Sequence, residues 1–128
     1  MDLVVVIMLL AIVQFIVFGA LVGLTRNKFA VHAPATEGNE GWERRFRVQQ
    51  NTMEQLVSFI PAIWICATYA SVWAACLLGV VYLVGRTLYA VSYIKDPASR
   101  GPGMVVTFAA VVSLVLAGLG GVITSLMA

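Results

Sequence analysis

Hydrophobic residues in this chain are grouped into long blocks that are separated by short polar stretches. The first block extends from Leu3 to Leu24 and is interrupted only by Gln14. A helix over residues 3–24 would be about 33 Å long, enough to cross a hydrocarbon core of about 30 Å. No basic segment precedes the block and no A-x-A site follows it. We therefore expect a retained membrane span and not a cleaved signal peptide.

Three further blocks predict three further helices, over about residues 43–72, 73–95 and 104–127. The second is polar in its first three turns, becomes apolar from Leu56, and contains Pro61, which should kink it. Residues 95–103 contain two prolines and two glycines and predict a turn. The pattern therefore predicts an all-α membrane protein, a bundle of four transmembrane helices, with residues 1–128 as a single domain.

Composition and charge narrow the class of protein. Apolar residues make up 61% of the chain, charged residues 11%, and mean hydropathy is +0.95, whereas soluble domains average about 25% charged residues. The net charge of +2 gives no electrostatic basis for binding nucleic acid, so no nucleic-acid partner is expected. Cys66 and Cys76 lie in apolar surroundings and are interpreted as packing residues. No metal site is expected.

The basic residues predict the orientation in the membrane. They flank the first and third connections, whereas the second connection and both termini have none (Arg26, Lys28, Arg44, Arg45, Arg47, Lys95, Arg100). By the positive-inside rule, we expect these two connections to face the cytoplasm and both termini to lie on the opposite side.

Two polar stripes interrupt the apolar pattern near the expected cytoplasmic side. Helical spacing places Arg47, Asn51 and Glu54 on one face of the second helix, and Arg86, Tyr89 and Tyr93 on one face of the third. The stripes are consistent with a shared polar cavity, although Glu54 and Arg86 could equally be a pair that neutralises two charges inside a bundle. Their guanidinium, carboxylate, phenol and amide groups suit a small, zwitterionic, peptide-like ligand.

Two motifs carry a family resemblance. Residues 43–54, ERRFRVQQNTME, resemble the E-R-x-x-R-x-Q-x-N-x-x-E signature of the MAPEG family, membrane-associated proteins in eicosanoid and glutathione metabolism. Residues 85–93, GRTLYAVSY, resemble its G-R-x-x-Y-x-x-x-Y pattern, followed at family spacing by Arg100. The resemblance covers essentially the whole chain. It implies a homotrimer of four-helix subunits that binds glutathione between neighbouring subunits, near the cytoplasmic surface.

The resemblance also implies roles for individual residues. Arg100 matches the arginine that activates the glutathione thiol. Glu54 would bind the γ-glutamyl ammonium while arginines hold the carboxylates, and Arg26 would close the site from the end of the first helix. The residues expected to bind glutathione are Arg26, Arg47, Gln49, Asn51, Glu54, Arg86, Tyr89 and Tyr93. The second substrate would be a hydrophobic electrophile or a lipid hydroperoxide that arrives through membrane lipid.

Departures from the family pattern affect the expected activity. Asn27 stands where leukotriene-synthase-like members often have a second arginine, and Leu88 replaces a basic residue found in some of them. Both favour a general glutathione transferase, with possible peroxidase activity, over leukotriene synthesis. A lipid-binding scaffold without enzymatic activity is the alternative, which the retained glutathione residues disfavour. A small drug/proton exporter is disfavoured because the first helix has no membrane carboxylate, only Gln14.

Overall fold

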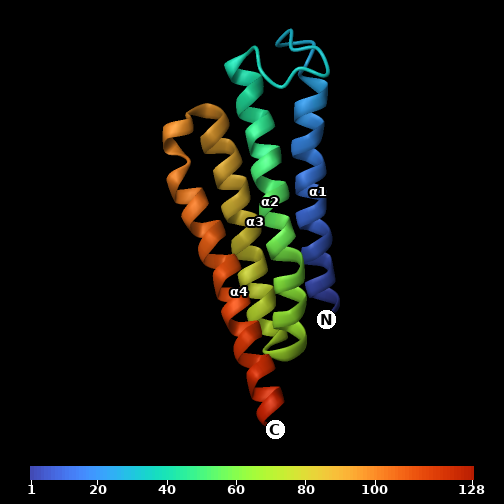
Figure 1. Ribbon diagram of the computed structural model, residues 1–128, viewed down its shortest axis with the longest axis vertical. Coiled ribbons are helices and arrows are strands. Elements are labelled where there is room, and N and C mark those ends of the chain that lie inside the picture. The colour runs from blue at the N-terminus through green and yellow to red at the C-terminus, as the bar shows by residue number, and fades with distance from the viewer.

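The computed structural model describes residues 1–128 as four long helices and one short 3₁₀ helix (Figure 1). The helices are α1 (Asp2–Leu24), α2 (Glu40–Tyr69), α3 (Val72–Lys95) and α4 (Gly101–Met127), and the 3₁₀ helix η1 (Pro97–Ser99) precedes α4. No strand is present. The all-helical prediction is therefore confirmed.

The helix boundaries differ from the predicted ones for identifiable reasons. α2 begins at Glu40, three residues before the predicted start, because the side chain of Asn39 accepts a hydrogen bond from the Trp42 amide at 3.2 Å and caps the helix. It ends at Tyr69, and Ser71 caps α3 in the same way. α4 begins at Gly101, before the predicted residue 104, since a proline is tolerated in the first turn of a helix.

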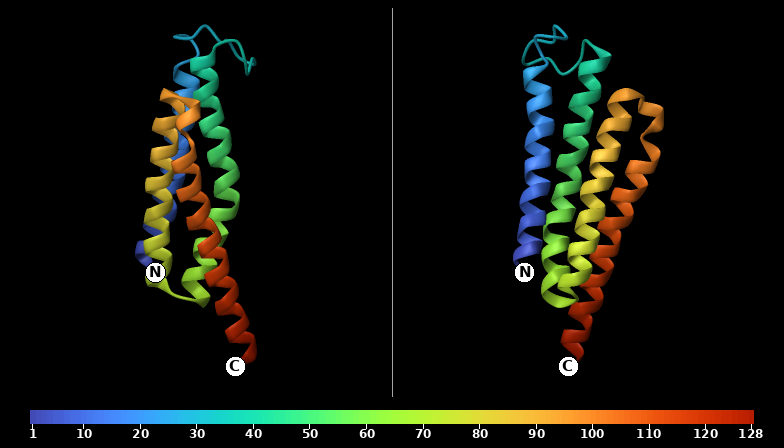
Figure 2. Two further views of the ribbon diagram at one scale, coloured as in Figure 1. Left: turned by 90° about the vertical axis from the view of Figure 1, so that its left-hand side faces the viewer. Right: turned by 180° about the vertical axis from the view of Figure 1, so that it is seen from behind.

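The four helices run up and down alternately (Figure 1). Both termini and the tight α2–α3 connection lie at one end of the bundle, and the α1–α2 and α3–α4 connections lie at the other (Figure 2). α1 packs against α2 and α3, and α4 packs against the opposite side of the same two helices. The two basic connections therefore share one end of the molecule, which is called the loop end below.

Three segments are long and apolar enough to cross a membrane: Asp2–Leu24, Val72–Lys95 and Pro97–Met127. Four such helices were expected. α2 is as long as the others but does not reach the same apolar level, because its charged residues extend from Glu40 to Glu54. Its crossing of the membrane therefore stays a prediction.

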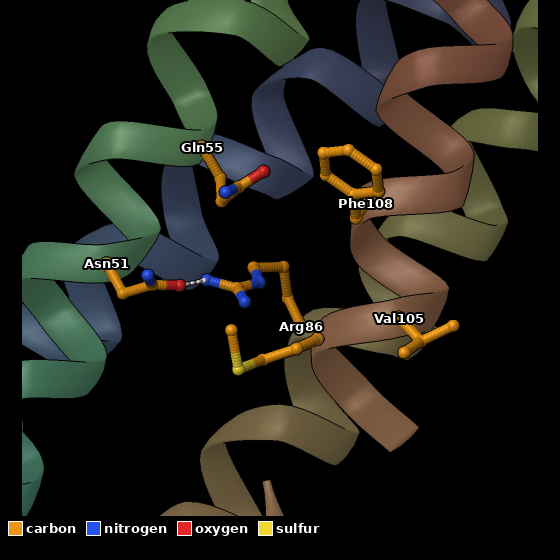
Figure 3. A pocket seen from close by; sticks show the side chains of 6 residues that line it. Asn51, Gln55, Arg86, Val105 and Phe108 are labelled. Carbon is orange, nitrogen blue, oxygen red and sulfur yellow. Dashed lines mark hydrogen bonds between the residues drawn. The ribbon is translucent and has the colours of Figure 1, made fainter. Parts of the chain in front are cut away.

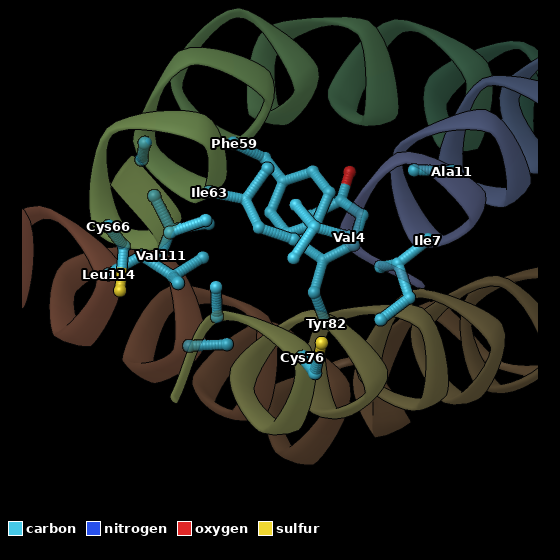
Figure 4. Close-up of a cluster of buried hydrophobic side chains, with 14 residues drawn as sticks. Val4, Ile7, Ala11, Phe59, Ile63, Cys66, Cys76, Tyr82, Val111 and Leu114 are labelled. Carbon is cyan, nitrogen blue, oxygen red and sulfur yellow. The ribbon is translucent and has the colours of Figure 1, made fainter. Parts of the chain in front are cut away.

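The largest buried apolar cluster fills the half of the bundle nearest the termini (Figure 4). Phe59 of α2 stacks on Tyr82 of α3 with ring centroids 3.7 Å apart, and both side chains are fully buried. Gly79 lets α3 approach this cluster closely, since a Cβ there would lie 2.7 Å from Ile7 and 2.8 Å from Ile63. The buried polar side chains, Thr52, Arg86 and Thr107, lie outside this cluster.

Polar side chains tie the helices together towards the loop end. Gln14 donates from Nε2 to the Leu83 carbonyl at 3.1 Å and to the Thr87 hydroxyl at 3.0 Å, which joins α1 to α3. Arg44 donates to the last carbonyls of α3, those of Ile94 and Lys95, at 3.2 and 3.3 Å. These bonds fix the register of α2 and α3 where the predicted polar stripes lie.

Candidate functional site

An open polar pocket of about 340 Å³ lies at the loop end, between α2, α3 and the start of α4. It is lined by Arg47, Gln50, Asn51, Glu54, Tyr89, Tyr93, Arg100 and Met104. The two predicted stripes and the predicted catalytic arginine thus meet within one chain. Two guanidinium groups, one carboxylate, two amides and two phenols face this single space.

The helical period of α2 divides the predicted residues of this helix into two groups. Arg47, Asn51 and Glu54 line the pocket, whereas Gln49, about 200° around the helix from Arg47, faces α1. The amide of Gln49 lies 3.4 Å from the position a Cβ would take at Gly19. Gln49 therefore lies on the opposite side of α2 from the pocket of its own chain.

Arg26 also lies away from the pocket, in the α1–α2 connection. It donates hydrogen bonds to the carbonyls of Val31 at 3.3 Å and Ala35 at 2.8 Å. Its guanidinium lies 4.5 Å from the centre of the Trp42 ring, and this tryptophan is fully buried and donates to the Val22 carbonyl at 2.9 Å. Within one chain Arg26 thus orders the connection and contributes nothing to the pocket.

The bend between α3 and α4 positions Arg100. The carboxylate of Asp96 caps η1 by accepting from the Ala98 amide at 3.1 Å, and Ser99 donates to the carbonyls of Ser92 and Asp96 at 3.0 and 2.7 Å. Arg100 follows directly, precedes the first residue of α4, and donates from Nη1 to the Pro97 carbonyl at 3.0 Å. Its side chain is exposed at the mouth of the pocket.

Gly103 allows α4 to start directly against the pocket wall. A Cβ at this position would lie 2.5 Å from the backbone nitrogen of Tyr89 and 2.6 Å from its Cα. Because the clash would be with backbone, no side-chain rotation could relieve it. The close approach brings Arg100 and Met104 beside the aromatic wall, where the rings of Tyr89 and Tyr93 stack 5.5 Å apart.

Arg86 is buried beneath the pocket, with 1% of its surface exposed. Its Nη1 donates to Asn51 Oδ1 at 2.8 Å (Figure 3). Nη1 also donates to the Thr52 hydroxyl at 3.2 Å, and Nε donates to the Thr107 hydroxyl at 3.3 Å. The guanidinium carbon also lies 4.2 Å from the centre of the Tyr89 ring. Arg86 therefore joins α2, α3 and α4 through neutral groups.

A neutralising pair between Glu54 and Arg86, which the sequence left open, does not form. The chain has one ion pair, Arg44 with Glu40 at 2.6 Å, on the surface of α2. Glu54 instead lines the pocket with an exposed side chain. Its carboxylate is accordingly free for a ligand.

Sequence reasoning missed four residues. Thr52 and Thr107 are fully buried acceptors for Arg86, and Gln50 and Met104 complete the pocket lining. The sequence held a signal for two of them, since Met104 lies one helical turn after Arg100 and Gln50 adjoins Asn51. Thr52 and Thr107 are found only through the packing of the helices around Arg86. For metal binding the pocket offers little, because nowhere in the chain do three His, Cys, Asp or Glu side chains lie together.

Comparison with known proteins identifies the family. The model of the MAPEG family matches residues 4–120, almost the whole chain. The chain belongs to the MAPEG family. Among similar proteins, an uncharacterized protein from Synechocystis sp. is 45% identical over 94 residues, covering 73% of this chain and 69% of the relative.

Two groups of named relatives are also similar. Human microsomal glutathione S-transferase 2 is 34% identical over 110 residues, which cover 86% of this chain and 75% of the human protein. Bovine leukotriene C4 synthase is 33% identical over 75 residues, which cover 59% of this chain and 50% of the bovine protein. The resemblance to the MAPEG family inferred from the two motifs is thereby confirmed.

Proposed function

We propose that this protein is an integral membrane glutathione transferase that acts as a homotrimer. The observation that carries the proposal is the pocket at the loop end, where Arg47, Asn51, Glu54, Tyr93 and Arg100 face one space. Microsomal glutathione S-transferase 2 and leukotriene C4 synthase among the relatives support glutathione as the ligand.

The pocket matches glutathione group by group. Glutathione has one ammonium, two carboxylates, two peptide groups and a thiol. Glu54 supplies the only carboxylate of the pocket and would bind the ammonium, while Arg47 would bind a carboxylate. Because Asn51 Oδ1 already accepts from Arg86, its Nδ2 is the part of the amide left to donate to a glutathione oxygen.

Arg100 is proposed to activate the thiol. A free thiol has a pKa of about 8.5, so little of it is ionised at neutral pH. A guanidinium at the pocket mouth stabilises the thiolate, while the thiol proton leaves to water. The thiolate then attacks an electrophilic carbon, forming a thioether as the leaving group departs with the bonding electrons.

Reduction of lipid hydroperoxides is proposed as a second activity of the same thiolate. Attack on the terminal peroxide oxygen breaks the O–O bond, and the alkoxide takes a proton to leave as an alcohol. The glutathione sulfenic acid that forms reacts with a second glutathione to give the disulfide and water. All electrons come from the two glutathione molecules.

The positions of Gln49 and Arg26 support a site shared between subunits. Both lie on the α1 side of α2, away from the pocket of their own chain. The resemblance of the motifs to the family nevertheless implies that both contact glutathione. In a ring of copies, the α1 side of one subunit can face the pocket side of the next. The proposed trimer would then complete each pocket with Gln49 and Arg26 of a neighbouring copy.

The proposed membrane placement has all four helices crossing, with the loop end in the cytoplasm. Three helices are apolar enough to cross by themselves. α2 would cross because its apolar half packs within the bundle and its polar half lies at the loop end, where glutathione in water can enter. The basic connections at that end agree with the positive-inside rule.

A direct assay tests the proposal. The purified protein is mixed with glutathione and 1-chloro-2,4-dinitrobenzene, thioether formation is followed by absorbance, and glutathione binding is measured by calorimetry. We expect both binding and turnover. Binding without turnover on any electrophile or hydroperoxide would favour the lipid-binding scaffold, and absence of both would refute the proposal.

A further inference from the structure

An apolar groove runs between α1 and α3 and ends at the loop end. The part nearest the loop end is a space of about 350 Å³, lined by Phe18 and Leu21 of α1 and by side chains of α3 from Thr87 to Lys95. A second space of about 390 Å³ shares Thr87 and continues towards the termini, lined by Leu83, Val84, Thr87 and Leu88. The two spaces together are called the α1–α3 groove below.

The groove has about the depth of one leaflet of a bilayer. From Leu83 to Lys95, α3 rises about 18 Å, and half of a hydrocarbon core of about 30 Å is about 15 Å. Lys95 is the last residue of α3 and is exposed. In the proposed membrane placement, the groove is thus apolar at the depth of acyl chains and basic at the depth of the headgroups.

The ammonium of Lys95 has no partner in the chain. The one ion pair joins Arg44 to Glu40. The adjacent carboxylate, that of Asp96, is directed to η1, where it accepts from the Ala98 amide. Lys95 is also the only charged residue that lines the groove. Charge complementarity therefore favours an anion where the groove meets the membrane surface.

We propose that the α1–α3 groove binds an anionic phospholipid of the leaflet at the loop end, with its headgroup on Lys95 and one acyl chain between α1 and α3. The second chain lies along Val84, Leu88 and Val91, which form an exposed apolar row beside the groove. A zwitterionic headgroup has an ammonium of its own beside the phosphate and gains less from Lys95. The lipid class is therefore selected by charge.

The groove stays open to lipid in the proposed trimer. The faces that would meet between copies lie on either side of α2, because one has the pocket and the other has Gln49 and Arg26. The α1–α3 groove belongs to neither face. Gln14 supplies the side-chain hydrogen bonds between α1 and α3, and a bound acyl chain adds apolar contacts between the same helices nearer the loop end. Bound lipid should therefore stabilise the bundle.

Native mass spectrometry of the purified full chain in detergent measures the preference for an anionic headgroup. Dioleoyl phosphatidylglycerol and dioleoyl phosphatidylcholine, which have identical chains, are titrated separately. We expect the anionic lipid to bind about fivefold more tightly, the effect of one basic residue at a membrane surface. Lys95→Gln should remove this preference. Lys28→Gln, which changes an exposed lysine outside the groove, should keep it. Equal affinity for the two lipids in the unchanged protein would overturn the proposal.

A pair of tryptophan variants locates the lipid on the molecule. Val91→Trp narrows the groove and should weaken binding of both lipids and the rise in unfolding temperature that phosphatidylglycerol causes. Val80→Trp is the matched control, because Val80 is also about half-exposed and lies on the same side of α3, about 16 Å further from the loop end. It should change neither. Equal effects of the two variants would contradict the assignment to this groove.

Two further measurements separate this site from other lipid and ligand sites. Oleic acid should displace phosphatidylglycerol poorly, and displacement as strong as that by phosphatidylglycerol itself would show a site for a free acid and overturn the phospholipid assignment. Glutathione binding should be unchanged in Lys95→Gln and Val91→Trp, because neither residue lines the glutathione pocket. Parallel loss of glutathione and lipid binding would show a general structural effect and overturn a separate lipid site.

Discussion

Arg86 on α3 and Asn51 on α2 are joined by a hydrogen bond of 2.8 Å between Nη1 and Oδ1. The bond connects the buried polar network beneath the pocket with a residue that lines the pocket itself. It also determines which end of the Asn51 amide is available to a ligand, because the oxygen is already engaged. This hydrogen bond marks the transition between the apolar core and the polar pocket at the loop end.

Substitutions of Asn51 should separate stability from binding. Asn51→Asp supplies a charged acceptor to Arg86 and should unfold at or above the temperature of the unchanged protein, yet it lacks the Nδ2 donor and should bind glutathione more weakly. Asn51→Leu should lose both binding and about 1–3 kcal/mol of stability, since it leaves Arg86 with an unmet donor. Thermal unfolding in detergent and calorimetry measure the two effects. Unchanged glutathione affinity in Asn51→Asp would contradict the proposed orientation.

Substitution of Arg100 should affect thiol ionisation more than binding. With Arg100 present, the pKa of the bound thiol should lie below its free value of about 8.5, so that thiolate forms already near neutral pH. In Arg100→Ala the titration should shift upwards towards that value, and activity should rise with pH over the same range. Ultraviolet absorbance of the thiolate and pH–rate profiles measure the shift. Arg100→Lys, which keeps a positive charge, should shift less.

A methyl group at Gly103 should separate the start of α4 from α3. A Cβ there would meet the Tyr89 backbone at 2.5 Å, so Gly103→Ala should destabilise the protein by about 1–3 kcal/mol and impair activity by displacing Arg100. Gly101→Ala is the matched control, because a Cβ at Gly101 meets nothing within 4 Å. Thermal unfolding and conjugation rates of the two variants are compared. Equal stability of the two would show that α4 adapts without cost.

Mixed assemblies should show whether the pocket is shared between copies. Gln49→Ala and Glu54→Gln should each impair glutathione binding when present in every subunit. If Gln49 completes the pocket of a neighbouring copy, every mixed trimer of the two variants would contain one intact site among its three interfaces, about a third of them. Co-expression with two different affinity tags isolates such assemblies. Recovery of activity in these mixed assemblies supports a site shared between subunits. If no activity is recovered, Gln49 and Glu54 either belong to the pocket of one and the same subunit or do not both belong to the pocket.

The sequence predicted the helices and most of the pocket because both depend on local order. Long apolar blocks determine where helices form, and a period of 3.6 residues determines that Arg47, Asn51 and Glu54 share a face. Boundaries were predicted less well. The start of α2 at Glu40 depends on one side-chain cap, from Asn39, within a polar region that has no periodic pattern.

The tertiary structure decided how these faces are used. The sequence left open whether Glu54 and Arg86 neutralise each other, and only the packing of α2, α3 and α4 directs Arg86 to Asn51, Thr52 and Thr107. These acceptors are 21 to 35 residues away from Arg86 along the chain, so no local pattern could reveal them. Helical periodicity fixes the face on which a side chain lies, whereas close packing between helices fixes its partners.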